Sequence, residues 1–285
     1  MRAFRMRTWV GLVFVLPSLL GGMIFVGIPF IDAIRRSVTA PLTGVFVGLD
    51  AYRSVFETPS FLRAIQNTGR FIGLCVPALL VLSLSLALML SQSVLGRSAL
   101  RASFLLPMAI PVASVALLWQ VLFHRSGVIN SMLWTLGFSA VDWMKTDWAL
   151  FCLIVSYVWK NLGYTMVLFL AGLSGISPAL YEAASVDGAG KGRQFISITL
   201  PCLKPTMFTV TVLSLLNAFK AYREAYLVAG NYPQGSIYLL QHTLNNWFAA
   251  LEIEKLSAAA IVTALVIMVL VMILNWTWSM NASWE

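Results

Sequence analysis

Polar side chains inside two apolar segments are the first candidates for chemistry. Asn161 and Tyr164 lie three residues apart in one segment, and Ser214 and Asn217 lie three residues apart in the next. Side chains at this spacing share one face of a helix. At about 1.5 Å per residue, Asn161 and Asn217 each lie roughly 16 Å from the end of their segment, near the middle of a membrane. Polar groups at that depth suit a path for a neutral polar solute such as a sugar, or hydrogen bonds between helices.

A charged, glycine-containing interruption separates these two apolar segments. Its pattern is Glu182-Ala183-Ala184, then Gly188, then Ile198, then Leu200-Pro201. Pro178, after the possible N-cap Ser177, predicts a helix start with Glu182 in the first turn. Gly188 predicts a break, after which a second helix begins. The interruption is therefore expected to form a small helix pair that offers Glu182 to a cation on another protein.

The second half of the interruption is apolar. Ile198 and Leu200 predict an exposed apolar knob, and Pro201 is expected to end the segment before the next span. The alternative is a surface loop whose glycines only make turns. The run Gly188–Gly192 lacks the spacing of a phosphate-binding loop, and no strand precedes it, so we expect no ATP site in this chain.

The elements that position these residues are membrane spans. Hydrophobic residues make up 59% of the chain and charged residues 11%, whereas a soluble domain has about 25% charged residues. Since about 20 apolar residues cross a bilayer as a helix, the sequence predicts an all-α membrane protein with six transmembrane helices in one domain, residues 1–285. The expected spans are roughly 10–34, 70–94, 102–123, 149–172, 206–229 and 256–279, with the interruption at 173–205.

The first span and the side on which it begins require separate arguments. Its apolar core is longer than that of a signal peptide, and no small-residue cleavage site follows, so we expect it to be retained. Arg2, Arg5 and Arg7 before the span favour a cytoplasmic N-terminus, but Arg35 and Arg36 follow it. Basic residues divide equally between the two sides, so charge alone does not fix the orientation.

The composition argues against several other functions. His124 and His242 stand alone, which predicts no metal site and no catalytic histidine, and no acids pair within the spans. Cys75, Cys152 and Cys202 form no motif and are expected to pack as apolar residues. The net charge of +8 concerns membrane orientation here and not nucleic-acid binding. A membrane enzyme is therefore disfavoured, whereas a passive channel or scaffold stays an alternative.

The pattern at 182–201 resembles the EAA loop of permease subunits in ABC importers, and every fixed position of that loop is filled. Phe104–Pro111, Gly127–Asn130 and Trp159 with Gly163-Tyr164 resemble the maltose-transporter type of sugar permease. This likeness is close from about Arg97 to Val228. The resemblance implies the transmembrane domain of a type I ABC importer in a prokaryotic inner membrane, with both termini cytoplasmic.

The resemblance also implies partners. These are a second homologous permease, two ATPase subunits, an extracytoplasmic solute-binding protein, membrane lipid and a small-molecule sugar, with no nucleic acid. ATP and Mg would be bound by the ATPase subunits, and this chain would hold no cofactor. The seven residues of the pattern would contact the ATPase: Glu182, Ala183, Ala184, Gly188, Ile198, Leu200 and Pro201. Sugar contacts of the family fall at positions that align with Asn161, Tyr164, Ser214, Asn217 and Tyr222.

One departure from the family pattern bears on the cargo. Sugar permeases often carry an aromatic–acid pair where this chain has Tyr222-Arg223-Glu224. The change indicates either an anionic or large ligand, or an internal ion pair at the outer rim. Lys160 and Lys220 receive no role from the pattern. A polyamine or a phosphate ester is the alternative solute, and the absence of acids at mid-depth in spans four and five favours a neutral sugar.

Overall fold

The chain folds into helices. The computed structural model describes residues 14–40, 43–91, 96–230, 232–233 and 235–279. No strand occurs within these ranges, apart from an isolated bridge between Thr39 and Phe46. The prediction of an all-α protein is confirmed.

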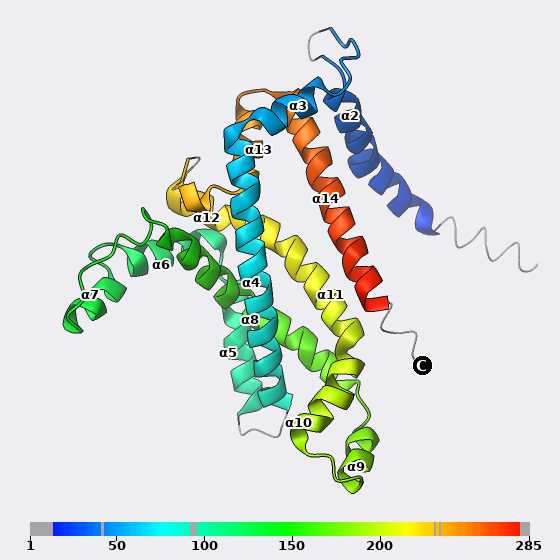
Figure 1. The fold of residues 1–285 in the computed structure, drawn as a ribbon, viewed down its shortest axis with the longest axis vertical. Coiled ribbons are helices and arrows are strands. Elements are labelled where there is room, and N and C mark those ends of the chain that lie inside the picture. Colours follow the sequence, from blue (N-terminus) through cyan, green and yellow to red (C-terminus); the bar gives the residue numbers. More distant parts are fainter. Residues whose placement is uncertain (1–13, 41–42, 92–95, 231, 234, 280–285) are drawn as a thin grey trace, which may run out of the picture. The chain divides into compact units, whose positions relative to one another are not determined.

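The helices follow one another with short connections (Figure 1). Helical residues 14–22 lead into η1 (Met23–Gly27). The α-helices are α2 (Ile28–Ser37), α3 (Asp50–Glu57), α4 (Pro59–Ser91), α5 (Arg97–Ala109), α6 (Val112–Phe123), α7 (Val128–Thr135), α8 (Trp148–Ser174), α9 (Pro178–Val186), α10 (Lys191–Gln194), α11 (Leu200–Ala218), α12 (Tyr222–Ala229), α13 (Leu240–Ala249) and α14 (Ile253–Ser279). The remaining turns are π-helical η2 (Phe195–Thr199) and the 3-10 turns η3 (Phe219–Ala221) and η4 (Gly235–Ile237).

Six helical stretches are long and apolar enough to cross a membrane, which agrees with the predicted number. Within the described residues they are Phe14–Ser37, Pro59–Ser91, Val112–Thr135, Trp148–Ser174, Lys191–Ala229 and Ile253–Trp278. The predicted residues 10–13 of the first span and 92–94 of the second, and Arg2, Arg5 and Arg7, lie outside the described ranges. The helical stretch that includes the fifth span begins at Lys191, well before the predicted start.

The predicted third span, 102–123, is divided between two helices. Helix α5 ends at Ala109 and α6 begins at Val112. Ile110 between them is extended, with φ −74° and ψ 128°. A residue that precedes a proline is pushed out of the helical region by the proline ring, so Pro111 breaks the apolar run that the sequence presents as continuous.

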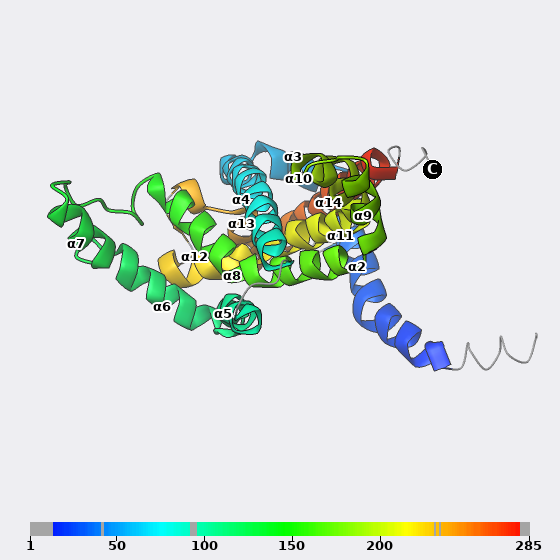
Figure 2. The same ribbon diagram turned by 90° about the horizontal axis from the view of Figure 1, so that it is seen from below.

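Contacts group the chain into two compact units: residues up to Phe61 with Leu244–Val269, and Leu62–Thr243 with the residues from Leu270 on. In the second unit, helix α8 is central. Helices α5 and α11 both pack against it (Figure 2). A buried cluster that includes Phe71, Leu79 and Tyr157 lies towards one end of α8, and a cluster around Met166 and Phe169 lies towards the other.

Two glycines bring α8 close to its neighbours. A Cβ atom built on Gly163 would lie 1.9 Å from the carbonyl oxygen of Phe104 in α5, so the two backbones touch there. A Cβ on Gly172 would lie 2.5 Å from Oγ1 of Thr206 in α11. Small residues permit this approach between membrane helices, which gain stability from close packing.

The first unit is held by polar and aromatic contacts. The hydroxyls of Ser37 in α2 and Tyr52 in α3 form a hydrogen bond of 2.9 Å. The ring of Phe61, which is fully buried, stacks on Trp247 at 5.7 Å between centroids. The first contact joins α2 to α3, and the second joins the start of α4 to the end of α13.

Candidate coupling loop and solute pathway

The interruption at residues 173–205, from here on called the coupling loop after its expected role, forms the predicted helix pair. Helices α9 and α10 project beyond the ends of α8 and α11 (Figure 1). Ser177 is the N-cap of α9 and Pro178 its first residue, although the serine side chain makes no capping hydrogen bond. The placement of Glu182 was wrong by one turn, because a helix that starts at Pro178 puts it in the second turn and not the first.

Gly188 ends α9 by a Schellman motif. It has φ +75°, and the amide of Ala189 donates to the carbonyl of Ala184 at 2.8 Å. The amide of Gly188 donates to the carbonyl of Ser185 at 3.1 Å. This motif requires a left-handed residue, which glycine adopts without the steric penalty of a Cβ atom. The predicted break at Gly188 is confirmed.

Side-chain hydrogen bonds fix the loop internally. Tyr181 and Thr199 share a hydrogen bond of 3.0 Å between their hydroxyls. Gln194 donates through Nε2 to Oγ of Ser185 at 2.9 Å and to the carbonyl of Ala189 at 3.0 Å. The two halves of the loop therefore present one ordered surface.

The exposed apolar part of this surface differs from the predicted knob. Ile198 and Leu200 are half-buried, whereas Val186 is 88% exposed and Ile196 66% exposed. Sequence reasoning missed both, although Val186 follows Glu182 by four residues and so lies on the same face of α9. Glu182 itself is exposed. The outward face of the loop combines an acid with uncovered aliphatic side chains.

Pro201 does not end the segment as predicted. The chain is helical without interruption from Lys191 through η2 and α11 to Ala218. The π-helical turn of η2 lies directly before Pro201, and a wider turn of this kind accommodates a residue that lacks an amide proton. The loop is thus continuous with the fifth span.

One of the predicted pathway residues, Ser214, lies where α8 and α11 meet. Tyr157 donates its hydroxyl to the carbonyl of Ser214 at 3.1 Å. Asn161 donates through Nδ2 to the carbonyl of Tyr157 at 2.8 Å. Ser214 is buried, while Asn161 and Tyr164 are half-buried. The structure therefore brings spans four and five together at this level, and it places Ser214 in the contact between them.

Asn217 and Tyr222 lie where the fifth span changes its winding. Helix α11 ends at Ala218, and the 3-10 turn η3 leads into α12. Lys220 donates through Nζ to Oδ1 of Asn217 at 3.2 Å. The ring of Tyr222 lies 4.6 Å from that of His242 and 5.5 Å from that of Tyr226. Asn217 and Tyr222 are half-buried, so part of each side chain remains open to contact.

Lys160, to which the sequence assigned no role, forms an ion pair with Glu224. Nζ of Lys160 lies 2.9 Å from Oε1 of Glu224, and the side chains are 13% and 12% exposed. The pair joins α8 to α12 across 64 positions of sequence, so no local pattern could have revealed it. An internal ion pair was one of the two alternatives predicted for the segment Tyr222-Arg223-Glu224, but the partner of Glu224 is Lys160 and not a residue near it in sequence.

A small cavity adjoins this pair. Its volume is about 20 Å³, and Trp119, Ser156 and Glu224 are among its lining residues. The indole Nε1 of Trp119 and Oγ of Ser156 are buried and have no hydrogen-bond partner among the described residues. A cavity of this volume has room for about one water molecule.

His242, predicted to be isolated, lies in an aromatic setting outside the candidate spans. Its Nδ1 accepts a hydrogen bond of 3.1 Å from the amide of Leu239, and its ring stacks on Tyr238. The side chain is 1% exposed. Burial lowers the pKa of His242 to about 4. The imidazole is therefore neutral near pH 7.

Acid should destabilise the chain through this histidine. Because the folded-state pKa is below the ordinary value near 6.5, the unfolded chain takes up a proton first as the pH falls. Stability is fully present above about pH 6.5 and should drop by about 2 kcal/mol by pH 5. Thermal unfolding of the purified chain at several pH values measures this. His242→Gln should remove this part of the pH dependence, and His124→Gln, at an exposed site, should not. An unchanged slope in His242→Gln would contradict the assignment.

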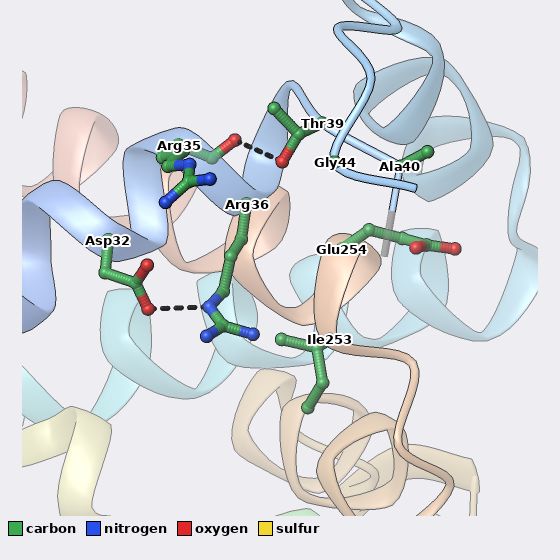
Figure 3. Close-up of a pocket in the computed structure, with 8 residues that line it drawn as sticks. All are labelled: Asp32, Arg35, Arg36, Thr39, Ala40, Gly44, Ile253 and Glu254. Carbon is green, nitrogen blue, oxygen red and sulfur yellow. Dashed lines mark hydrogen bonds and ion pairs between the residues drawn. The ribbon is translucent and has the colours of Figure 1, made fainter. Parts of the chain in front are cut away.

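A polar pocket that was not predicted from the sequence lies in the first unit (Figure 3). Its volume is about 160 Å³. Arg36 pairs with Asp32 at 2.6 Å, and the hydroxyl of Thr39 donates to the carbonyl of Arg35 at 2.9 Å. Glu254 completes the lining from the start of α14, and its Oε2 has no partner among the described residues. The pocket can receive small polar groups.

Within the described part of the chain, no three His, Cys, Asp or Glu side chains gather closely enough to hold a metal ion. The fold and these sites define a multi-pass membrane component. Its long helices carry an ordered polar loop, the coupling loop, at one end. The chain belongs to the family of binding-protein-dependent transport system inner membrane components, whose model matches residues 79–280.

Known proteins resemble the chain over most of its length. It is 32% identical to the trehalose/maltose transport system permease protein MalF of Thermococcus litoralis, over 94% of this chain and 91% of that protein. It is 32% identical to the sulfoquinovosyl glycerol transport system permease protein SmoG of Agrobacterium fabrum, over 80% of this chain and 78% of that protein. The crystal structure of a bacterial ABC transporter involved in the import of the acidic polysaccharide alginate has a chain that matches with a TM-score of 0.84 and 28% identity, covering 98% of this chain and 99% of that one. The predicted type I importer permease fold is confirmed.

Proposed function

We propose that this chain is one permease of an ATP-driven importer for a carbohydrate, and that it forms half of the translocation pathway. The ordered coupling loop carries the proposal, because a rigid projecting helix pair with an exposed acid and aliphatic side chains suits a docking partner. The cargoes named for the relatives, trehalose or maltose and sulfoquinovosyl glycerol, support a carbohydrate as cargo. The half-buried Asn161, Tyr164, Asn217 and Tyr222 offer hydrogen bonds and rings of the kind that sugars use.

The partners in this proposal follow from the family. A second permease completes the pathway, two ATPase subunits bind ATP and Mg, and a solute-binding protein delivers the cargo from outside. A solved alginate transporter is described as a complex with a substrate-bound periplasmic protein, which supports the last of these. This chain itself is non-catalytic and holds no cofactor, and the coupling loop and both termini face the cytoplasm.

The helical continuity of the loop with the fifth span suggests how coupling works. A displacement of the loop by an ATPase moves α10, η2 and α11 together, because no flexible linker separates them. Helix α11 contacts α8 through Tyr157 and Ser214 and, nearer the loop, through Gly172 and Thr206. Movement at the loop therefore reaches the level of Asn217 through packed helices, as alternating access requires.

The docking role is tested on the complex purified in mild detergent from its native membrane. The ATPase and the second permease should co-purify with this chain. Glu182→Ala should abolish cargo-stimulated ATP hydrolysis while the chain stays inserted in the membrane. A chain that purifies alone, or ATP hydrolysis indifferent to Glu182, would remove the docking role and favour a passive channel or scaffold.

Gly188→Val should also uncouple the complex, because a β-branched residue at φ +75° is strongly disfavoured. Left-handed backbone costs about 1–2 kcal/mol for a residue with a Cβ atom, and we expect the end of α9 to rearrange. Gly190→Val is the matched control, since Gly190 is extended at φ −68° with open space at its Cβ position. Transport should fall at least tenfold in the first variant and stay near normal in the second. Equal transport in both would show that the Schellman turn does not matter for coupling.

A further inference from the structure

The C-terminal part of the fifth candidate span carries two cations, Lys220 and Arg223, that no described acid neutralises. Lys220 and Arg223 are both exposed and lie within Lys191–Ala229. The nearest acid in sequence, Glu224, is taken by Lys160 at 2.9 Å. Lys220 contacts only the neutral amide oxygen of Asn217, and Arg223 makes no side-chain hydrogen bond or ion pair with the described residues. This stretch therefore keeps two positive charges.

The winding of the helix gathers these charges on one side. Lys220 lies in the 3-10 turn η3 (Phe219–Ala221) and Arg223 in the first turn of α12, and side chains three residues apart on a helix share one face. Lys220 and Arg223 are three residues apart. Tyr222 and Tyr226, with ring centroids 5.5 Å apart, lie on the same short stretch, and Tyr226 is 38% exposed. Cations and aromatic faces thus occur together next to Asn217.

Charged side chains within membrane spans are costly and usually serve a function there. A free Glu224 would neutralise one of the two cations, Lys220 or Arg223, and the site would then suit the neutral sugar that the sequence favours. With Glu224 committed to Lys160, the basic pair lacks a counter-charge of its own. A carboxylate, sulfonate or phosphate on a ligand supplies one, and arginine binds such groups with paired hydrogen bonds.

We propose that Lys220 and Arg223 bind an acidic group of the cargo, so that the importer carries an anionic carbohydrate. The inference rests on the proposed function as a carbohydrate permease and names the class of its substrate. Asn217, which Lys220 holds by its side-chain oxygen, keeps its amide nitrogen for a sugar oxygen. The tyrosine rings offer a face to the sugar ring.

The test uses the whole importer in lipid nanodiscs: this chain, its partner permease, its ATPase and its solute-binding protein. The probes are oligosaccharides in matched pairs, such as trigalacturonate with galactotriose and cellobiouronic acid with cellobiose, together with sugar phosphates. The measured quantity is the rate of probe-stimulated ATP hydrolysis. Acidic probes should stimulate it, and their neutral counterparts should not.

Variants then connect the effect to the two cations. Arg223→Gln and Lys220→Gln should each lower stimulation by the acidic probe about tenfold or more, because a charged hydrogen bond is lost. Arg223→Lys should restore much of it. Arg125→Gln, which removes an exposed arginine outside this stretch, is the control and should change nothing. Hydrolysis without a probe should persist in the Arg125→Gln control.

Four outcomes would overturn the inference. Stimulation by neutral probes alone would do so while leaving the carbohydrate function intact. No stimulation by any carbohydrate, in a complex that still co-purifies with its ATPase and its partner permease, would remove the inference and the carbohydrate cargo together. Loss of the partner permease from Lys220→Gln or Arg223→Gln would show that the cations pair with that subunit. An effect seen only in discs with anionic lipid would assign them to a lipid headgroup.

Discussion

Replacing Glu224 by glutamine should destabilise the folded chain by about 3–5 kcal/mol, one of the two largest effects we expect. Glutamine keeps the shape of the side chain but leaves the ammonium group of Lys160 without its counter-charge. Since both side chains are only 12–13% exposed, water cannot replace the lost partner. Helix α12 would lose a link to α8, and the neighbouring cavity beside Trp119 would lose a charged wall.

Thermal unfolding in detergent and recovery of the assembled complex measure this effect. The double variant Lys160→Met with Glu224→Leu should recover much of the loss, because it removes both charges and leaves none unpaired. Glu57→Gln is the matched control. It breaks the exposed pair between Arg53 and Glu57, which is 2.8 Å long, and should cost less than about 1 kcal/mol. Similar losses from Glu224→Gln and Glu57→Gln would show that burial of the first pair has no energetic weight.

Gly163→Ala should disrupt the packing of α5 on α8. The added Cβ atom would lie 1.9 Å from the carbonyl oxygen of Phe104, 2.3 Å from its carbonyl carbon and 2.8 Å from the amide nitrogen of Leu105. All three are backbone atoms, so no side chain can rotate away and the helices must separate. Overpacking typically costs about 1–3 kcal/mol, and a clash with rigid backbone should reach about 3 kcal/mol or more.

Gly73→Ala provides the comparison for Gly163→Ala. Gly73 also lies inside a long apolar helix, but nothing stands within 4 Å of its Cβ position. Alanine there should be neutral or raise stability by up to about 1 kcal/mol, since glycine is the weaker helix former. The two variants should therefore shift the unfolding temperature in opposite directions or to very different extents. A tolerated Gly163→Ala would mean that α5 and α8 do not approach as closely as described.

The features that the sequence predicted correctly are those written in local patterns. Runs of apolar residues predict spans, and a glycine between two helix-forming stretches predicts the turn at Gly188. Pro111 breaks a helix by its effect on Ile110, but an apolar run counted by composition alone conceals this. Pro201 was expected to end a helix, but the helix continues through it. The π-helical turn before Pro201 accommodates the proline, and no local pattern predicts that turn.

The features that the sequence did not predict depend on residues far apart in the chain. Lys160 and Glu224 have no shared motif, and only the packing of α8 against α12 brings them together. Ser214 appeared equivalent to Asn217 because both are polar and three residues apart. The hydroxyl of Tyr157 reaches the backbone of Ser214, however, and the contact between α8 and α11 buries that residue. The predicted roles of the pathway residues stay predictions until transport is measured.

The π-helical turn η2 also sets an angle. A π turn holds one residue more than the hydrogen bonding of an α-helix would allow, and each residue of an α-helix turns the chain by about 100°. The extra residue between Gln194 and Leu200 therefore fixes the direction in which Asn217 points relative to the outward face of α9 and α10. The orientation of α9 and α10 and the orientation of Asn217 therefore depend on each other through η2. Insertions or deletions in η2 would rotate every later side chain of the fifth span about the helix axis, whereas substitutions would leave this angle unchanged.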